Sequence, residues 1–113
     1  MASLKSDVDN QISVAFPFFV RFTWDPHKEQ LNIAKHDVDF TKASKAFDDP
    51  QARIAFDSVH SSAELRWWLM GKVDGRILLV RYTHRPDGII RIIGAGFWSK
   101  AEKFYAKEKA RKG

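Results

Sequence analysis

The sequence contains no cysteine in its 113 residues. This excludes a disulfide framework, a thiolate metal site and a cysteine nucleophile. Long apolar runs are also missing, because the longest, residues 14–20, is too short to cross a bilayer. That run includes Pro17 and follows acidic residues, whereas a secretory signal follows basic ones. We therefore expect a cytoplasmic protein without a membrane partner.

Several familiar catalytic and cofactor motifs are absent as well. The chain has no Gly-x-Ser-x-Gly elbow, no phosphate-binding loop and no dinucleotide fingerprint. The four histidines show no His-x-x-x-His spacing, and they are His27, His36, His60 and His84. The sequence therefore predicts no metal site and no cofactor.

What the chain does contain suits one packed domain. Apolar residues make up 44% and aromatic residues 13% of it, which is enough for a core at this length. We expect residues 1–15 to form a loose leader and residues 16–113 a single domain. The net charge is +5, and residues 100–113 hold six Lys or Arg against two Glu. Such a basic tail suits nucleic acid or an acidic partner, although a solvated helix end explains it equally well.

The first third of the domain predicts a strand and two helices. Residues 16–24 are rich in Phe and Val, which favours a strand, and an early proline places it at a sheet edge. Asp25 followed by Pro26 is typical of a helix start, and this helix should end near His36. Asp39 is placed to cap a second, shorter helix.

The middle of the chain predicts antiparallel strands. Residues 53–59 suit one strand, and residues 64–84 suit a hairpin that turns at Asp74-Gly75. This turn fixes the register, so that Val73 should lie opposite Arg76.

The register sorts the hairpin side chains onto two faces. The face turned away from the core should carry Arg66, Trp68 and Arg81. His84 falls on the core side, where we expect a buried, hydrogen-bonded histidine. The core face should collect Leu65, Trp67, Leu69, Val73, Leu78, Val80 and Tyr82.

A last strand over residues 89–95 and a helix that opens at Ser99 complete the prediction. The order is β-α-α-β-β-β-β-α. Short hairpin loops make most of the sheet antiparallel, with the helices packed on it, which is an α+β fold.

A polar stripe on the first helix is one candidate site. Lys28, Asn32, Lys35 and His36 recur at i, i+4, i+7 and i+8, so they share one side of the helix. The stripe suits RNA phosphate, with His36 as a proton-transfer group, because histidine exchanges protons readily at neutral pH. A solvated helix face is the simpler alternative.

The Arg66, Trp68 and Arg81 cluster is the other candidate. An aromatic ring between two guanidinium groups is typical of single-stranded RNA recognition, in which bases stack on the ring. A stabilising cross-strand cation–π pair is the alternative. Arg85 and Arg91 lie further along the same segment, and the face that Arg91 occupies is open.

Taken in order, these residues resemble the BrnT family of ribonuclease toxins. The most specific segment is Trp-Asp-x-x-Lys-x-x-x-Asn-x-x-Lys-His, over residues 24–36. Further matches follow at Val38, Phe40, Ala43, Phe47, Arg66, Gly71, Leu78-Leu79-Val80, Tyr82-Thr83, Arg91-Ile92-Ile93 and Glu102.

The resemblance implies a RelE-like fold, metal-independent RNA cleavage and neutralisation by a BrnA-like, DNA-binding antitoxin. Such cleavage needs a base, an acid and cations around the phosphate. We expect His36 to transfer the proton with support from Lys35, and Arg66, Arg81 and Arg91 to hold the phosphate. The expected RNA-binding residues are Lys28, Asn32, Trp68 and Arg85. Glu29 and Tyr82 are the alternative bases.

Departures from the family pattern define the competing hypothesis. Asp37 stands where the family usually has glycine, and Gly96 stands where it commonly has arginine. Loss of that arginine predicts a weakened ribonuclease. The alternative is a binding module that retains antitoxin or RNA binding but no longer cuts.

Overall fold

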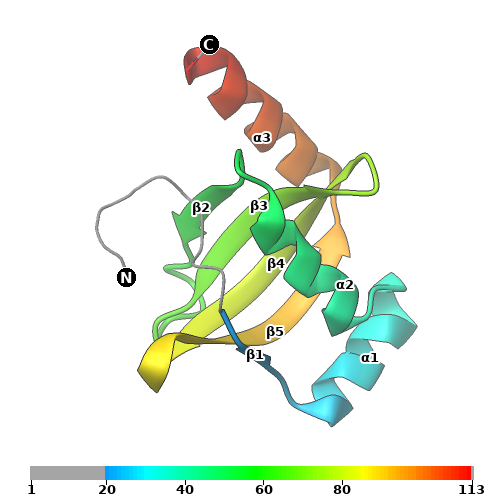
Figure 1. The fold of residues 1–113 in the computed structure, drawn as a ribbon, viewed down its shortest axis with the longest axis vertical. Coiled ribbons are helices and arrows are strands. Elements are labelled where there is room, and N and C mark those ends of the chain that lie inside the picture. Colours follow the sequence, from blue (N-terminus) through cyan, green and yellow to red (C-terminus); the bar gives the residue numbers. More distant parts are fainter. Residues whose placement is uncertain (1–19, 113) are drawn as a thin grey trace.

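The computed structural model describes residues 20–112. The predicted leader and residues 16–19 lie outside this range. The helices are α1 (Pro26–His36), α2 (Phe40–Ser44) and α3 (Ser99–Lys112), with 3-10 turns η1 (Lys45–Asp48) and η2 (Pro86–Gly88). The strands are β1 (Phe22–Thr23), β2 (Arg53–Phe56), β3 (Trp67–Val73), β4 (Arg76–Arg85) and β5 (Ile89–Phe97) (Figure 1). The predicted order and the α+β class are confirmed.

The five strands form one sheet in the order β1-β5-β4-β3-β2, and only the β1–β5 pair is parallel. The predicted hairpin register is confirmed, since Val73 pairs with Arg76 and Trp68 pairs with Arg81. Asp74 and Gly75 have φ of 52° and 79°, as a two-residue hairpin turn requires. β1 lies at a sheet edge, as predicted.

The main core lies between one face of the sheet and the α2–η1 segment. Phe40 and Ala43 of α2 are fully buried there. The Asp39 side chain caps this helix by accepting the Lys42 N–H. Facing them are the predicted core residues Leu69, Val73, Leu78, Val80 and Tyr82.

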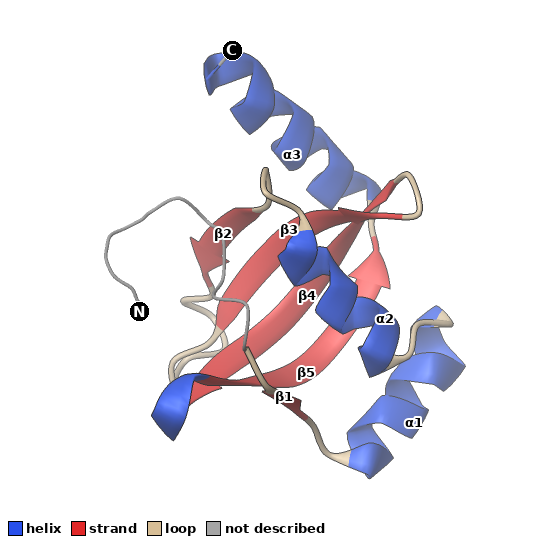
Figure 2. Ribbon diagram, viewed as in Figure 1, coloured by secondary structure: helices blue, strands red, loops and turns tan. Residues whose placement is uncertain are grey.

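The other face of the sheet is only partly covered, by α3. Met70 and Ile77 pack there against Ala101 and Tyr105. The Tyr105 hydroxyl donates to Asp49 Oδ2 at 2.8 Å, which ties α3 to the segment after η1. Figure 2 shows α3 extending beyond the sheet.

Three local predictions are wrong. The strand predicted over residues 53–59 ends at Phe56, because Asp57 turns inward to bind other side chains. Leu65 is 61% exposed, since β3 begins only at Trp67. His84 is exposed near the end of β4, where its ring packs edge to face with the ring of Tyr82.

Helix α1 has the ends that its sequence predicts. The Asp25 carboxylate accepts the His27 N–H, and Pro26 occupies the first turn. At the other end Asp37 adopts the left-handed conformation, with φ of 56°, and its N–H donates to Ile33 O. The helix therefore stops directly after the Lys35-His36 pair.

None of the helices among the described residues is both long and apolar enough to span a membrane.

Gly71 should tolerate no side chain. A Cβ atom there would lie 2.3 Å from the carbonyl oxygen of Ala46, because η1 packs directly on β3. We expect Gly71→Ala to lower the free energy of unfolding by about 1–3 kcal/mol or more, the usual range for overpacking a core. Urea unfolding checks this. Gly94→Ala is the control, since its Cβ would meet only Asn32 Oδ1 at 3.6 Å, and an equal loss there would contradict the packing argument.

Candidate functional site

Helix α1 is fixed to the sheet by one amide side chain. Asn32 Nδ2 donates to the carbonyl oxygens of Val38 and Ala95, each at 2.9 Å, and its Oδ1 accepts the Ala95 N–H at 3.1 Å. The side chain is 8% exposed, and its amide oxygen and nitrogen already bind the backbone. Its role is to place the polar face of α1 along β5.

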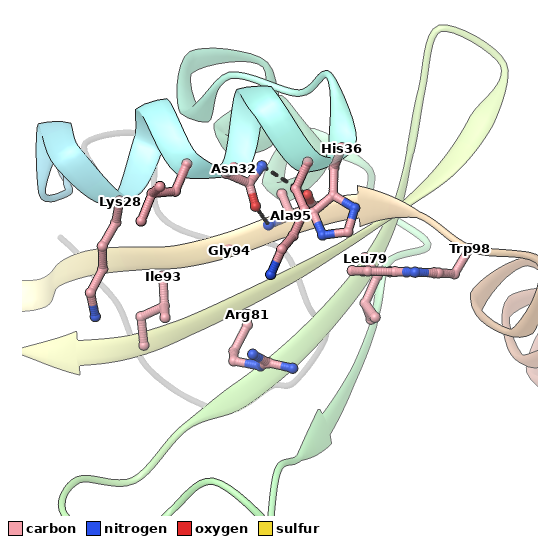
Figure 3. A pocket seen from close by; sticks show the side chains of 11 residues that line it. Lys28, Asn32, His36, Leu79, Arg81, Ile93, Gly94, Ala95 and Trp98 are labelled. Atoms are coloured by element: carbon pink, nitrogen blue, oxygen red, sulfur yellow. Dashed lines mark hydrogen bonds between the residues drawn. The ribbon is translucent and has the colours of Figure 1, made fainter.

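A pocket of about 320 Å³ lies between α1 and strands β4 and β5. Lys28, Lys35 and His36 line it from α1, and Arg81 lines it from β4. In Figure 3, Lys28 and His36 lie at opposite ends of the helix face, with Arg81 across from them. Among the described residues that line the pocket there is no carboxylate. Asn32 lines it as well, so the structure brings together five of the predicted site residues.

Strand β5 and its end form the wall beside His36. The rings of His36 and Trp98 meet edge to face, 5.0 Å apart. A Cβ atom at Gly96 would lie 3.0 Å from Trp98 Cη2 and 3.3 Å from His36 Cγ. The position at which the resemblance predicts an arginine therefore adjoins the pocket, and the Trp98 ring fills that space.

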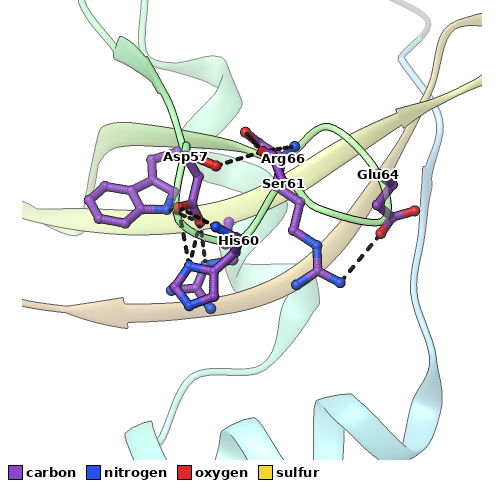
Figure 4. Close-up of polar contacts among 7 residues, drawn as sticks. Asp57, His60, Ser61, Glu64 and Arg66 are labelled. Carbon is purple, nitrogen blue, oxygen red and sulfur yellow. Dashed lines mark hydrogen bonds and ion pairs between the residues drawn. The ribbon is translucent and has the colours of Figure 1, made fainter.

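A buried carboxylate, Asp57, organises the next part of the sheet face. Asp57 is 2% exposed and accepts the Trp68 indole N–H at 2.8 Å. Its Oδ2 also lies 3.3 Å from Arg81 Nε and 3.0 Å from His60 Nδ1. Figure 4 shows Asp57 with His60 beside it. Arg81 and Asp57 therefore form an ion pair, while the buried Arg81 Nε makes no hydrogen bond within the described part of the chain.

The same contacts keep Asp57 ionised. Burial alone would raise the pKa of the Asp57 carboxyl, but hydrogen bonds from Trp68 and His60 outweigh burial and lower it below its ordinary value of 3.8. The carboxylate therefore remains negative at neutral pH and holds both Arg81 and the Trp68 indole in place.

We expect Asp57→Asn to lower the free energy of unfolding by about 1–3 kcal/mol at neutral pH, because the ion pair with Arg81 is lost. A lowered pKa stabilises the fold above pH 3.8, and this stabilisation is lost as the pH falls through the folded-state pKa. The difference from the parent should therefore shrink below about pH 4, as measured by urea unfolding across pH. Asp48→Asn, at an exposed carboxylate, should change little at any pH. A deficit that is independent of pH would contradict the assignment.

The remaining predicted arginines lie outside the pocket. Arg66 Nη2 and Arg85 Nη1 both bind Glu64, at 3.5 and 2.7 Å. The Arg85 hydrogen bond, helped by Arg66, lowers the pKa of Glu64 against the opposing effect of burial. Arg91 pairs with Thr83 in β4, which places it on the same sheet face as Arg81 and answers the open question of its orientation. These three arginines widen the basic surface beyond the pocket.

Neither alternative base is available to a substrate. Tyr82 is 1% exposed, and burial raises the pKa of its hydroxyl far above 10. Glu29 accepts the Trp24 indole N–H at 3.2 Å and the Phe40 N–H at 2.9 Å, so it joins α1 to the start of α2. His36 remains as a residue in the pocket whose side chain can both accept and donate a proton.

Among residues 20–112, no three His, Asp or Glu side chains converge as a metal ion would require.

Sequence reasoning missed Asp57, His60 and Trp98. Asp57 lies within residues 53–59, which the sequence predicts as a strand, and His60 follows directly after them. Trp98 follows the last predicted strand without a pattern that marks it. A carboxylate directly after a short strand was the available signal for Asp57.

The fold and the site together define a small α+β protein with a cationic pocket, containing one histidine, that suits a phosphodiester. The family model of the BrnT ribonuclease toxins of type II toxin–antitoxin systems matches residues 24–102, and the chain belongs to this family. The structure is similar to the 1.1 Å crystal structure of the Brucella abortus ribonuclease toxin BrnT, with a TM-score of 0.57 and 23% identity. The match covers 71% of this chain and 97% of that one. Among curated proteins, none matches the chain.

Proposed function

We propose that this protein is an endoribonuclease that cleaves single-stranded RNA without a metal ion, in the pocket between α1 and β4. The observation that carries the proposal is the convergence of Lys28, Lys35 and His36 with Arg81 in one pocket lined by no described carboxylate. Those cations supply the positive charge that a transition-state phosphate needs.

In this proposal, His36 exchanges the proton of the ribose 2′-hydroxyl. Arg81 binds the phosphate through its two terminal nitrogens, while Asp57 fixes Nε. Lys28 and Lys35 are exposed at the pocket mouth and attract the RNA backbone. The 2′-oxygen gives its proton to His36 and attacks the phosphorus, and the bond from phosphorus to the 5′-oxygen breaks. The 5′-oxygen takes up a proton from water and leaves as a hydroxyl group, and the other product is a 2′,3′-cyclic phosphate.

The test is cleavage of a labelled RNA by purified protein in EDTA. We expect cleavage to persist, and the DNA version of the same sequence to remain intact because it lacks the 2′-hydroxyl. Cleavage that requires an added divalent metal, or equal cutting of DNA, would overturn the proposed chemistry.

In the cell, we propose that the protein acts in the cytoplasm, inhibits growth and is neutralised by a BrnA-like antitoxin with a DNA-binding region. The basic, uncovered sheet face around Arg66, Arg85 and Arg91 supports an acidic protein partner. Co-expression with the product of the neighbouring gene should give a complex on gel filtration, and the complex should not cleave RNA.

A second candidate is a toxin fold that binds but cuts slowly or not at all. The observation that favours it is Gly96, where the Trp98 ring occupies the space beside His36 that an arginine side chain needs. A missing transition-state donor of this kind costs about 10²–10³-fold in rate.

Restoring the arginine therefore requires room for it. We expect the paired change Gly96→Arg with Trp98→Ala to raise the rate of RNA cleavage over Trp98→Ala alone. Gly96→Arg by itself should gain less, because its Cβ lies 3.0 Å from the Trp98 ring and 3.3 Å from the His36 ring. Initial rates on one RNA measure all three variants. No gain in the paired variant would mean that the arginine has no catalytic role in this chain.

A further inference from the structure

A second hollow adjoins the phosphate pocket. It has a volume of about 710 Å³ and lies between the sheet face and the start of α3. Its walls are Trp68, Met70 and Leu79 of the sheet with Trp98 and Phe104 on the other side. Leu79 and Trp98 also line the pocket that holds His36 and Arg81, here called the phosphate pocket, so the two spaces are adjacent. We call this hollow the α3 groove.

We propose that the α3 groove binds one nucleobase of the RNA, the base next to the phosphate held by Arg81. This inference rests on the proposed function, because it places the phosphate in the adjoining pocket. The volume lies in the range of about 300–1,000 Å³ that is usual for small organic ligands. An aromatic-lined slot beside a cationic pocket is the arrangement that single-stranded RNA recognition uses.

Trp68 is held ready for stacking. Its indole N–H already donates to Asp57, so the ring is fixed before RNA binds and this donor does not read a base edge. Phe104 and Trp98 are each 39% exposed on the facing wall. A base between these rings is bound by its flat face, which every base has.

The positive charge at the rim favours a polyanion such as RNA over a basic peptide. Lys100 lies at the rim, and no described residue that lines the groove is acidic. Ser99 and Lys100 are the only polar residues among those that line the groove, apart from the indole N–H groups. The groove should therefore accept all four bases with little discrimination, and it requires a base that is unstacked from its neighbours.

The test uses 2′-O-methyl RNA hexanucleotides, which cannot be cleaved because the 2′-oxygen is blocked. One probe carries all six bases, and six others carry an abasic site at successive positions. We expect fluorescence anisotropy to show about tenfold weaker binding when one particular position is abasic, as stacking of one base predicts. In Trp68→Leu the full probe should bind about tenfold more weakly, and the abasic change at that position should cost less than twofold.

Two further variants show whether weaker binding comes from the groove itself or from a loss of folding. Phe104→Ala changes an exposed side chain of α3 and should weaken the full probe about two- to fivefold. Phe56→Ala removes a comparably exposed aromatic ring from the opposite face of the sheet, at 47% exposure, and should leave binding unchanged.

The outcomes separate this inference from the proposed function. If RNA is cleaved but no abasic position loses affinity, or if Trp68→Leu keeps the full abasic penalty, the groove does not bind a base. If the abasic pattern is present but the protein does not cut RNA, the catalytic proposal fails and the base site stands. If Trp68→Leu and Phe104→Ala weaken the antitoxin complex and leave probe binding unchanged, the groove is a protein-docking site and the inference is overturned.

Discussion

Arg81→Ala is expected to slow RNA cleavage by about 10²–10³-fold, the usual cost of removing a donor that stabilises a transition state. Arg81 is the cation that the sheet contributes to the pocket, and its Nε is fixed by Asp57 at 3.3 Å. Lysine should restore little of the rate, because one ammonium group cannot both meet Asp57 and bind the phosphate with two nitrogens. Initial rates on one labelled RNA, at saturating and at low substrate concentration, measure the loss in kcat and in kcat/KM.

Arg85→Ala is the matched control for Arg81. It removes an arginine from the same strand, and the structure pairs it with Glu64 outside the pocket. We expect a change of less than about fivefold, mainly in KM, because a cation outside the pocket contributes to RNA attraction and not to the chemical step. Equal losses in both variants would mean that general charge, and not a positioned guanidinium, drives cleavage.

His36→Ala is expected to lower kcat by about 10²–10⁴-fold, the contribution of a positioned acid or base. His36 is half-buried in the pocket wall against Trp98, at the end of α1 that Asp37 closes. His27→Ala is the control, since it changes an exposed histidine in the first turn of the same helix. The kcat values of His36→Ala and His27→Ala on one RNA, measured between pH 5 and pH 8, show whether the loss is specific to His36.

The pH dependence gives the sharper result for His36. The parent should lose activity in acid, because a protonated imidazole cannot accept the 2′-hydroxyl proton. The residual activity of His36→Ala should lack that fall, whereas His27→Ala should keep it. An unchanged acid limb in His36→Ala would assign proton transfer to another group, with His60 as the first to test.

Much of this site could be predicted from local sequence. The spacing of Lys28, Lys35 and His36 places them on one side of a helix, and the Asp74-Gly75 turn places Trp68 opposite Arg81. Both rules depend on neighbours in the chain, so they hold without knowledge of the packing. These rules do not predict that α1 lies against β5 with its polar face turned toward Arg81.

Long-range placement explains the failures. Asn32 belongs to the same helical stripe as Lys28, yet it is buried because Ala95, 63 residues away, comes to lie beside it. Asp57 falls in a predicted strand, and only the packed structure shows that three side chains converge on it. Arg66 belongs to the predicted cluster, but Glu64 pairs it with Arg85 away from the pocket.

The bond between Asn32 and Ala95 also bears on when the protein becomes active. One wall of the pocket comes from residues 26–36, and the rest comes from β4, β5 and Trp98, which are synthesised later. A growing polypeptide lacks the site until β5 has left the ribosome and docked beside α1. Under the proposed function, the growing chain therefore cannot cleave RNA before β5 has docked, and the proposed antitoxin needs to bind only chains that have passed this point.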